Sequence, residues 1–244
     1  MVLGSLDSAG DLIRTHDTAL RVLAELGMRT DHAGMRERLA AKGCRIVGER
    51  VCIPAEVVTA SLQQIPPAFE VHGRRIGCRV TLGCAGCSYG INTGVMASII
   101  DLDSGRPRRS TLADVHAAAR LLDAMEHVDA IYVSLVDATE LPPHMVTVSD
   151  LAAVLRSTAK PLIGPGLANG AEAEAVVAVA LAVRGGADQL RHYPLCVPFI
   201  CAVTPLYYPR EVVDALIVVA EAGLPLDVIS GPVMGLTAPY TLAG

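Results

Sequence analysis

Residues 130–135 read Ala-Ile-Tyr-Val-Ser-Leu, a near-continuous apolar run of the kind that forms a parallel β-strand covered on both faces. Similar runs recur along the chain at 161–163, 198–203 and 226–229. Stretches with the apolar spacing of a helix separate them, at 149–157, 171–184 and 209–222. A further helix is expected from Thr111, because Thr111 and Asp114 have the spacing of a capping box. This alternation of strands and helices predicts an α/β fold with a parallel sheet.

The distance between these strands, roughly 30 to 40 residues, is close to the pitch of a TIM (β/α)8-type barrel, in which about 250 residues hold eight units. Residues 95–244 offer four such strands and a fifth candidate at Met96–Asp101, so the barrel is incomplete and corresponds to its first half. A doubly wound open sheet needs no more strands than these. Its first strand-to-helix turn, however, is expected to carry a glycine-rich phosphate fingerprint, which residues 136–140 lack. The pattern therefore favours the half-barrel.

Residues 1–94 form a smaller N-terminal portion, so we predict two domains, 1–94 and 95–244. Helical spacing is found at 11–26 and 31–42, and residues 44–53 alternate around Gly48 as in a β-hairpin. Pro54 is expected at the first position of a short helix. Two strands at 68–73 and 78–82 then lead into a glycine-rich loop at 83–94 with one extended segment. The basic cluster at 106–109 is interpreted as a solvated connection.

Composition excludes several classes of protein. The 244 residues are 52% hydrophobic and 18% charged, with 20 Lys and Arg against 25 Asp and Glu, a net charge of -5. An acidic chain without a polybasic run has no footprint for nucleic acid or an anionic membrane surface. Seven cysteines is an odd number, and no signal sequence is evident, so we expect a reduced, cytoplasmic protein rather than a secreted disulfide framework.

Two glycine- or cysteine-containing segments suggest sites, and neither is specific. Cys84-x-x-Cys87 lacks the second pair of ligands that a tetrahedral zinc site needs, so we expect it to bind no metal. The loop Gly164–Gly170 follows a strand and precedes a helix, where backbone amides can face an anion. No nucleophile elbow, phosphate-binding loop or HExxH motif is present.

Short segments spread through the chain resemble the trimethylamine methyltransferase family. The longest are Thr204-Pro205-Leu206-Tyr207-Tyr208-Pro209 and the Gly- and Pro-rich run 231–244. Others, in the same order as in the family, lie at 15–28, 50–54, 71–74, 101–109, 111–114 and 160–162. Their order along the chain makes the resemblance persuasive, although each is short.

The resemblance implies a (β/α)8 barrel after a small α/β portion, and an enzyme that moves a methyl group from a methylated amine to a corrinoid protein. The amine is trimethylamine in members that carry pyrrolysine and a quaternary amine such as a betaine in others. The corrinoid, a cobalamin-type cofactor, is carried by the partner protein. Family chains continue well past residue 244, so this chain corresponds to their N-terminal part.

Polar and aromatic side chains that follow the predicted strands are the candidate substrate-binding residues, because barrel sites lie beyond the carboxyl ends of the strands. They are Asp137, Glu140, Thr204, Tyr207, Tyr208, Ser230 and Met234, with Asn169 after the second strand and Tyr89 and Asn92 in the glycine-rich loop. With no Trp and two Phe, tyrosines are expected to supply any aromatic cage for a cation. No catalytic residue is assigned.

Two alternatives remain open: a catalytically inactive fragment, and an unrelated barrel lyase or isomerase that binds a phosphorylated substrate at Gly164–Gly170. A half-barrel also has two open edges, so the chain alone is expected to associate or aggregate, with a dimer as one outcome, and to methylate no corrinoid. The side chains expected to face the barrel interior, and to lose partners there, are Ile131, Val133, Phe199, Ile200, Val228 and Ile229.

Overall fold

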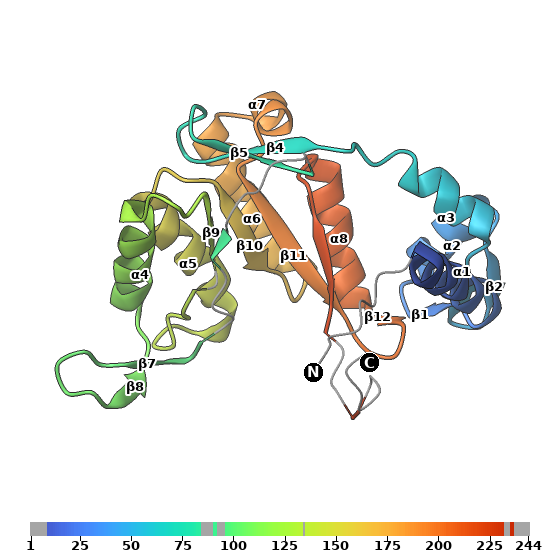
Figure 1. Ribbon diagram of the computed structural model, residues 1–244, viewed down its shortest axis with the longest axis horizontal. Helices are drawn as coiled ribbons and strands as arrows, with labels where there is room; N and C mark the ends of the chain where they lie inside the picture. The colour runs from blue at the N-terminus through green and yellow to red at the C-terminus, as the bar shows by residue number, and fades with distance from the viewer. Residues whose placement is uncertain (1–8, 84–89, 92–95, 134, 232–234, 237–244) are drawn as a thin grey trace. The chain divides into compact units, whose positions relative to one another are not determined.

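The computed structural model describes residues 9–83, 90–91, 96–133, 135–231 and 235–236 (Figure 1). Their contacts divide the chain into two compact units. The first unit comprises residues 1–66, 201–213 and 229–244, and the second comprises 67–200 and 214–228. The domain boundary at 94 and 95 stays a prediction.

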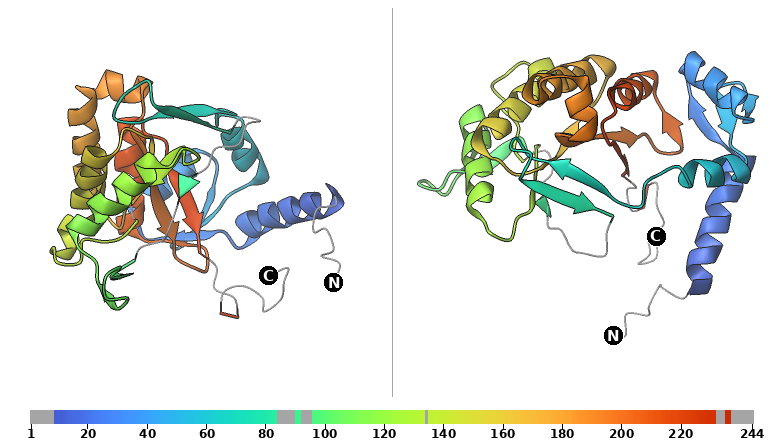
Figure 2. Two further views of the ribbon diagram at one scale, coloured as in Figure 1. Left: turned by 60° about the vertical axis from the view of Figure 1, so that its left-hand side comes forward. Right: turned by 90° about the horizontal axis from the view of Figure 1, so that it is seen from above.

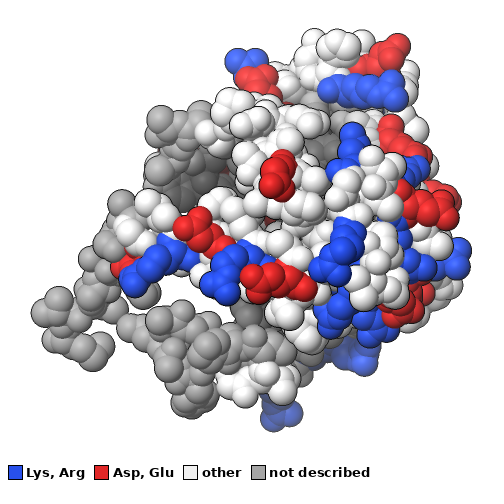
Figure 3. Space-filling view, turned by 90° about the vertical axis from the view of Figure 1, so that its right-hand side faces the viewer, with Lys and Arg blue, Asp and Glu red and all other residues white. Residues whose placement is uncertain are grey.

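In its described residues, the first unit holds a small sheet packed with helices from the N-terminal part of the chain. The helices are α1 (Ala9–Glu25), α2 (Ala33–Ala41) and α3 (Ala55–Leu62). The strands, in sheet order, are β12 (Tyr207–Tyr208), β1 (Met28–Thr30), β3 (Arg50–Cys52) and β2 (Arg45–Val47). The predicted hairpin is confirmed, since β2 and β3 pair antiparallel. Acidic and basic side chains are interspersed on the face seen in Figure 3.

The prediction that Pro54 is the first residue of a helix is wrong by one position. Pro54 is the N-cap residue of α3, and the helix begins at Ala55. Its backbone is extended, with ψ at 151°, and its carbonyl accepts the amides of Val57 and Val58 at 3.1 and 3.2 Å. Proline suits this position because its fixed φ is compatible with an extended residue just before a helix.

The second unit is built on a sheet whose strand order follows the chain. The strands are β6 (Gly90–Ile91), β9 (Ala130–Tyr132), β10 (Leu162–Gly166), β11 (Cys196–Ala202) and β13 (Asp227–Ser230). The first four pair in parallel with their neighbours. The predicted α/β class with a parallel sheet is therefore confirmed.

Helices cover one face of this sheet (Figure 2). They are α4 (Leu112–Ala124), α5 (Pro143–Ser157), α6 (Gly170–Arg184) and α8 (Arg210–Ala222), and a short α7 (Ala187–His192) follows α6. α5 packs against both α4 and α6. Ile131 of β9, Leu162 of β10 and Ile200 of β11 are fully buried. At roughly 25 cal/mol per Å² of apolar surface, burial of such side chains is the main stabilising term of this unit.

A β-hairpin packs on the face of this sheet that the helices do not cover. It consists of the two predicted strands, β4 (Phe69–His72) and β5 (Arg79–Leu82), which the structure pairs antiparallel. Its Val71 and Val80 form a buried cluster with Ala130 and Val197, near the amino ends of β9 and β11. The buried Arg184 holds the hairpin's exit by donating to the carbonyls of His72 and Gly73 at 2.7 and 3.0 Å.

The prediction that Met96–Asp101 supplies the fifth parallel strand is wrong. This segment forms β7 (Ser98–Ile100), which pairs antiparallel with β8 (Pro107–Arg109). The amide of Gly105 donates to the carbonyl of Asp101 at 2.8 Å and closes a tight turn, so the strand's hydrogen bonds go to its own hairpin partner. The fifth strand of the parallel sheet is β6, the extended segment of the glycine-rich loop.

The basic cluster at 106–109 is likewise more than a solvated connection, because it includes β8. Arg108 donates two hydrogen bonds of 2.7 Å to Asp114, the capping-box residue of α4. Asp114 also accepts the amide and hydroxyl of Thr111, both at 2.8 Å, as the capping box requires. Arg108 and Thr111 together hold the pKa of Asp114 well below its ordinary value.

Replacing Asp114 with asparagine is expected to lower the free energy of unfolding at pH 7 by about 2 kcal/mol, since it removes a bidentate ion pair and half of a capping box. A depressed carboxyl pKa stabilises the fold above the unfolded-state pKa and loses this effect as the pH falls through the folded-state pKa. The variant should therefore lose less stability than the wild type below about pH 4. Urea unfolding at several pH values measures this, with Asp103→Asn in the neighbouring exposed turn as control. Equal acid sensitivity of Asp114→Asn and wild type would contradict the prediction.

Among the described residues, no helix combines the length and the apolar character needed to cross a membrane.

Candidate functional site

The predicted site residues lie in several different environments. Tyr89, Asn92 and Met234 are outside the described residues, as are Cys84 and Cys87. Asp137 and Glu140 follow β9, Asn169 follows β10, and Ser230 is the last residue of β13 and is exposed. Their role in binding substrate stays a prediction.

Thr204 and the two tyrosines after β11 belong to a turn that returns the chain to the first unit. Val203 and Tyr207 exchange backbone hydrogen bonds of 2.8 and 2.9 Å, so the partly buried Thr204 lies inside a closed turn. Tyr207 and Tyr208 then pair in parallel with Arg29 and Thr30 of β1. Burial raises the pKa of the Tyr208 phenol.

Tyr207 contacts two charged side chains, one over its ring and one at its hydroxyl. The guanidinium of Arg29 lies 4.4 Å from the ring centroid, and the Tyr207 hydroxyl donates to Asp31 at 3.2 Å. Stacking of Arg29 gives this tyrosine a cation from its own chain. The arrangement ties β12 to β1, and whether Tyr207 also contacts substrate stays a prediction.

Asp137 and Glu140 share the end of β9 with Asp150, an acid that the sequence analysis did not single out. Asp150 lies on α5, is only 2% exposed, and its Oδ1 has no hydrogen-bond partner among the described residues. Burial, and then the charges of Asp137 and Glu140, raise its pKa to about 7. The signal in the sequence was an aspartate next to Leu151 and Val154 on a helix face that the fold buries.

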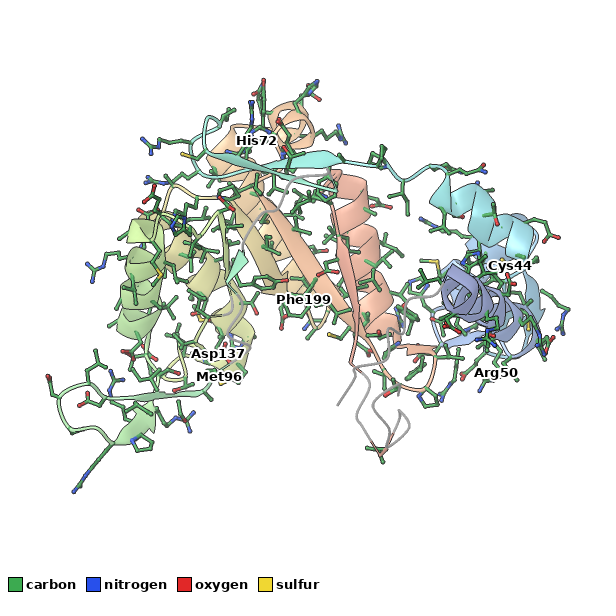
Figure 4. The ribbon with its side chains drawn as sticks, in the orientation of Figure 1. Cys44, Arg50, His72, Met96, Asp137 and Phe199 are labelled. Carbon is green, nitrogen blue, oxygen red and sulfur yellow. The ribbon has the colours of Figure 1, made fainter. Side chains whose placement is uncertain are left out.

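Hydrogen bonds with neighbouring backbone groups hold the other two residues of this acidic group, Asp137 and Glu140. The amide of Asp137 donates to the carbonyl of Met96 at 3.0 Å, and the two residues lie together in Figure 4. Glu140 accepts the amide of Leu112, at the start of α4, at 2.8 Å. Burial raises the pKa of Asp137. Among the described residues no three His, Cys, Asp or Glu side chains are placed to hold a metal ion.

In the loop Gly164–Gly170, the Ala168 amide and the Asn169 side chain donate hydrogen bonds to the carboxylate of Glu172. Asn169 caps α6 by accepting the amide of Glu172 at 3.0 Å, and the Glu172 carboxylate accepts the Ala168 amide and the Asn169 side chain at 3.0 and 3.2 Å. A carboxylate therefore occupies the place where a phosphate would bind, and its charge disfavours a second anion. A pocket of about 170 Å³ beside it is lined by His144, Thr147, Val148, Asn169, Ala171, Glu172 and Ala175.

Two aromatic rings lie over glycines of β10, on the face of the sheet away from α4, α5 and α6. A Cβ at Gly164 would be 2.7 Å from two ring carbons of Tyr132 and 3.1 Å from one of Phe199. A Cβ at Gly166 would be 2.8 Å from Cζ of Phe199. We call these four residues the aromatic floor; Phe199 is labelled in Figure 4.

The aromatic floor corrects one part of the sequence analysis. Ile131 and Ile200 are fully buried, whereas Tyr132 and Phe199, which follow or precede them in the same strands, are partly exposed. Consecutive residues of a strand point to opposite faces. The six side chains expected to face the barrel interior therefore mix the two faces of the sheet, and Tyr132 was missed.

Asp227 on β13 places a negative charge near this floor. Burial first, and then the charge of Asp227, raise the pKa of the Tyr132 phenol. Two strands, β10 and β11, separate β9 from β13 in the sheet. The sequence signal was weak, since Asp227 opens an otherwise apolar run.

Comparison with known proteins assigns the chain to a family. The family model described as Trimethylamine methyltransferase (MTTB) matches residues 5–244. Trimethylamine methyltransferase MttB of Desulfitobacterium hafniense (strain DSM 10664 / DCB-2) is 30% identical over 236 residues, which cover 96% of this chain and 47% of that protein. Glycine betaine methyltransferase of D. hafniense (strain Y51) is 28% identical, covering 95% of this chain and 48% of that protein.

A third relative is the proline betaine:corrinoid methyltransferase of Eubacterium limosum, 25% identical over 97% of this chain and 50% of that protein. The chain thus spans about half the length of the curated relatives it matches. The match of the family model over nearly every residue agrees with the resemblance found in the sequence. The chain therefore belongs to the trimethylamine methyltransferase family.

Proposed function

We propose that this chain provides the first half of a (β/α)8 barrel, which begins at β6, in an enzyme that transfers a methyl group from a methylated amine to a corrinoid protein. The observation that carries the barrel is the strand order β6-β9-β10-β11-β13, in which each strand is added beside the one before it in the chain. A doubly wound sheet reverses this order at a switch point. A barrel does not, because each unit continues the same right-handed path.

The proposed reaction requires the protein to position a cation more than it requires proton transfer. The nitrogen–methyl bond breaks with its electron pair on nitrogen, and a quaternary ammonium leaves as a neutral amine without a proton. Orientation of the donor is then the main contribution of the protein. Relatives named as glycine betaine and proline betaine methyltransferases support a quaternary amine, and those named trimethylamine methyltransferase support trimethylamine.

The methyl acceptor is expected to be a corrinoid carried by a partner protein, whose reduced cobalt supplies the nucleophile when bound. We place the reaction in the cytoplasm, where the seven cysteines of the chain would stay reduced.

The alternative of a phosphorylated substrate has less support. The Glu172 carboxylate uses the amide of Ala168 and the side chain of Asn169 in the loop that such a substrate would need. The other alternative, a catalytically inactive chain, is decided by assay.

The assay uses the protein encoded by the complete reading frame that contains residues 1–244, with free reduced cobalamin as acceptor. We expect trimethylamine or a betaine to convert it to methylcobalamin, followed by absorbance. Residues 1–244 alone are expected to give no conversion, because half of the barrel mouth is missing. A folded complete-frame protein that leaves cobalamin unchanged with trimethylamine, glycine betaine and proline betaine would overturn the proposal.

Residues 1–244 expressed alone are further expected to associate, as a dimer or larger species. The outermost strands of the sheet among the described residues are β6 and β13, and open strand edges pair with other chains. Half of Val228 on β13 is exposed, which adds apolar surface at that edge. Size-exclusion chromatography with light scattering measures the mass. A cooperatively folding monomer would contradict the half-barrel.

A further inference from the structure

The segment between β9 and α5 is fastened by several hydrogen bonds to the residues that precede α4. We call this segment, residues 135–142, the β9–α5 loop. The amide of Asp137 donates to the carbonyl of Met96 at 3.0 Å. Thr139 donates its amide and its hydroxyl to the carbonyl of Ser110, at 3.2 and 2.7 Å. The Ser110 hydroxyl donates to the carbonyl of Asp137 at 2.7 Å, so the loop holds the base of the β7–β8 hairpin at the carboxyl end of β9.

The same loop supports the first turn of α4. The Glu140 carboxylate accepts the amide of Leu112 at 2.8 Å, and Arg109 of β8 donates to the hydroxyl of Thr139 at 3.3 Å. Glu140 thereby brings a negative charge to the amino end of the helix, where the helix dipole favours it. A movement of the loop would break these contacts together.

Asp150 contacts this loop from α5 with a carboxyl group that is incompletely hydrogen-bonded. It is 2% exposed, and its Oδ1 has no hydrogen-bond partner among the described residues. The amide of Ala138, a fully buried loop residue, donates to the same carboxyl group. An ionised carboxylate is costly in such a place, because burial removes the water that would solvate it. The closed loop is thus compatible with the neutral acid and is destabilised by the anion.

The charges of the loop act in the same direction. Burial first, and then the charges of Asp137 and Glu140, raise the pKa of Asp150. The other charged side chains of α5 and of the two helices that pack against it are exposed or bound to other groups. On α4 they are Asp114, His116, Arg120 and Asp123, on α6 Glu172, Glu174 and Arg184, and on α5 itself His144 and Arg156.

We propose that the β9–α5 loop is a pH-sensitive latch, closed on Met96 and Ser110 while Asp150 is neutral and opened when Asp150 gives its proton to water. Opening lets solvent reach the carboxylate and separates it from Asp137 and Glu140, which relieves the cost of its charge. Sites in α/β folds lie beyond the carboxyl ends of the strands, so the latch acts at the edge of the sheet that a ligand approaches. It is independent of the proposed function, since it needs only the contacts of these residues.

The latch has a defined pH window. The pKa of Asp150 is about 7 in the closed form and returns to about 4 once the carboxyl group reaches water. A raised pKa of this kind stabilises the closed form fully below about pH 4, and this stabilisation is lost as the pH rises to about 7. With these two values, the equilibrium constant for opening should rise about tenfold between pH 6 and pH 8 and change little above that.

Amide hydrogen exchange on the complete-frame protein measures the opening. After correction for the intrinsic exchange rate, protection of the Asp137 and Thr139 amides should fall about tenfold from pH 6 to pH 8 in the wild type. In Asp150→Asn, which cannot ionise, protection should change by less than about twofold. Low concentrations of urea should leave these exchange rates unchanged, because a local opening exposes little surface, whereas core strands that exchange by global unfolding respond to urea.

Three further variants make the result specific. Asp188→Asn, at a side chain that is 94% exposed, should keep the tenfold change. Thr139→Val removes the hydroxyl bond to Ser110, so it should speed exchange at both pH values without altering their ratio. Asp137→Asn removes one like charge beside Asp150, so it should reduce the change to a few-fold, and it serves if Asp150→Asn does not fold.

Three outcomes would each overturn the latch. The first is loop protection in the wild type that is the same at pH 6 and pH 8. The second is a wild-type pH response in folded Asp150→Asn, or in folded Asp137→Asn if it replaces that variant. The third is exchange of the loop amides that follows urea as exchange of the core strands does.

Discussion

Replacing Asp150 with asparagine is expected to stabilise the protein at pH 8 by on the order of 4 kcal/mol. Asp150 is 2% exposed, its Oδ1 lacks a partner among the described residues, and Asp137 and Glu140 add like charge. The fold therefore favours the neutral acid, with a pKa of about 7. Asparagine has nearly the same shape and never ionises.

The effect should depend on pH with a defined sign. The pKa of an aspartate in an unfolded chain is about 4, so between about pH 4 and 7 the folded protein holds a proton that the unfolded chain has released. Wild-type stability then falls as the pH rises through this window and levels off above it. The stability difference between variant and wild type should grow by about 3 kcal/mol from pH 5 to pH 8.

Urea unfolding followed by circular dichroism at both pH values measures this difference. Asp137→Asn removes a neighbouring charge and should move the window to lower pH, whereas the exposed Asp188→Asn should leave it unchanged. A difference between Asp150→Asn and wild type that is the same at pH 5 and pH 8 would show that Asp150 is ionised in the folded protein.

The second large effect is expected from Gly73→Ala, which should cost about 3 kcal/mol or more, or prevent folding. A Cβ at Gly73 would overlap the carbonyl oxygen of Ala159 and lie 2.6 Å from the carbonyl carbon of Lys160. Both are backbone atoms that lead into β10, so no rotation of a side chain relieves the clash. To relieve this clash, the β4–β5 hairpin would have to move away from the segment that precedes β10.

Gly77 in the same hairpin turn provides the matched control. A Cβ there meets nothing within 4 Å, so Gly77→Ala should change stability by less than about 0.5 kcal/mol. Thermal and urea unfolding of both variants measure the contrast. Equal stability of the two would mean that β4 does not approach the loop before β10 this closely.

Local elements were largely predictable from the sequence. The capping box of Thr111 and Asp114 formed as its spacing predicts, and the apolar runs at 130–135 and 198–203 became β9 and β11. The candidate site was harder to predict from the sequence, because its main features depend on single residues within such apolar runs. In the sequence Tyr132 has the pattern of an ordinary strand residue, and only the close approach of its ring to Gly164 of β10 sets it apart.

The sequence by itself determined the order of helices and strands and the family, because helix caps, turns and apolar periodicity depend on residues within a few positions of one another. The tertiary structure alone decided which distant groups share an environment. Pairing of β12 with β1 placed Tyr207 beside Asp31 and Arg29. Asp150 likewise became an unusual acid only when α5 buried it beside Asp137. The charge state, burial and ring contacts of a side chain depend on its neighbours in space. A local sequence pattern does not predict them when those neighbours lie a hundred or so residues away in the chain.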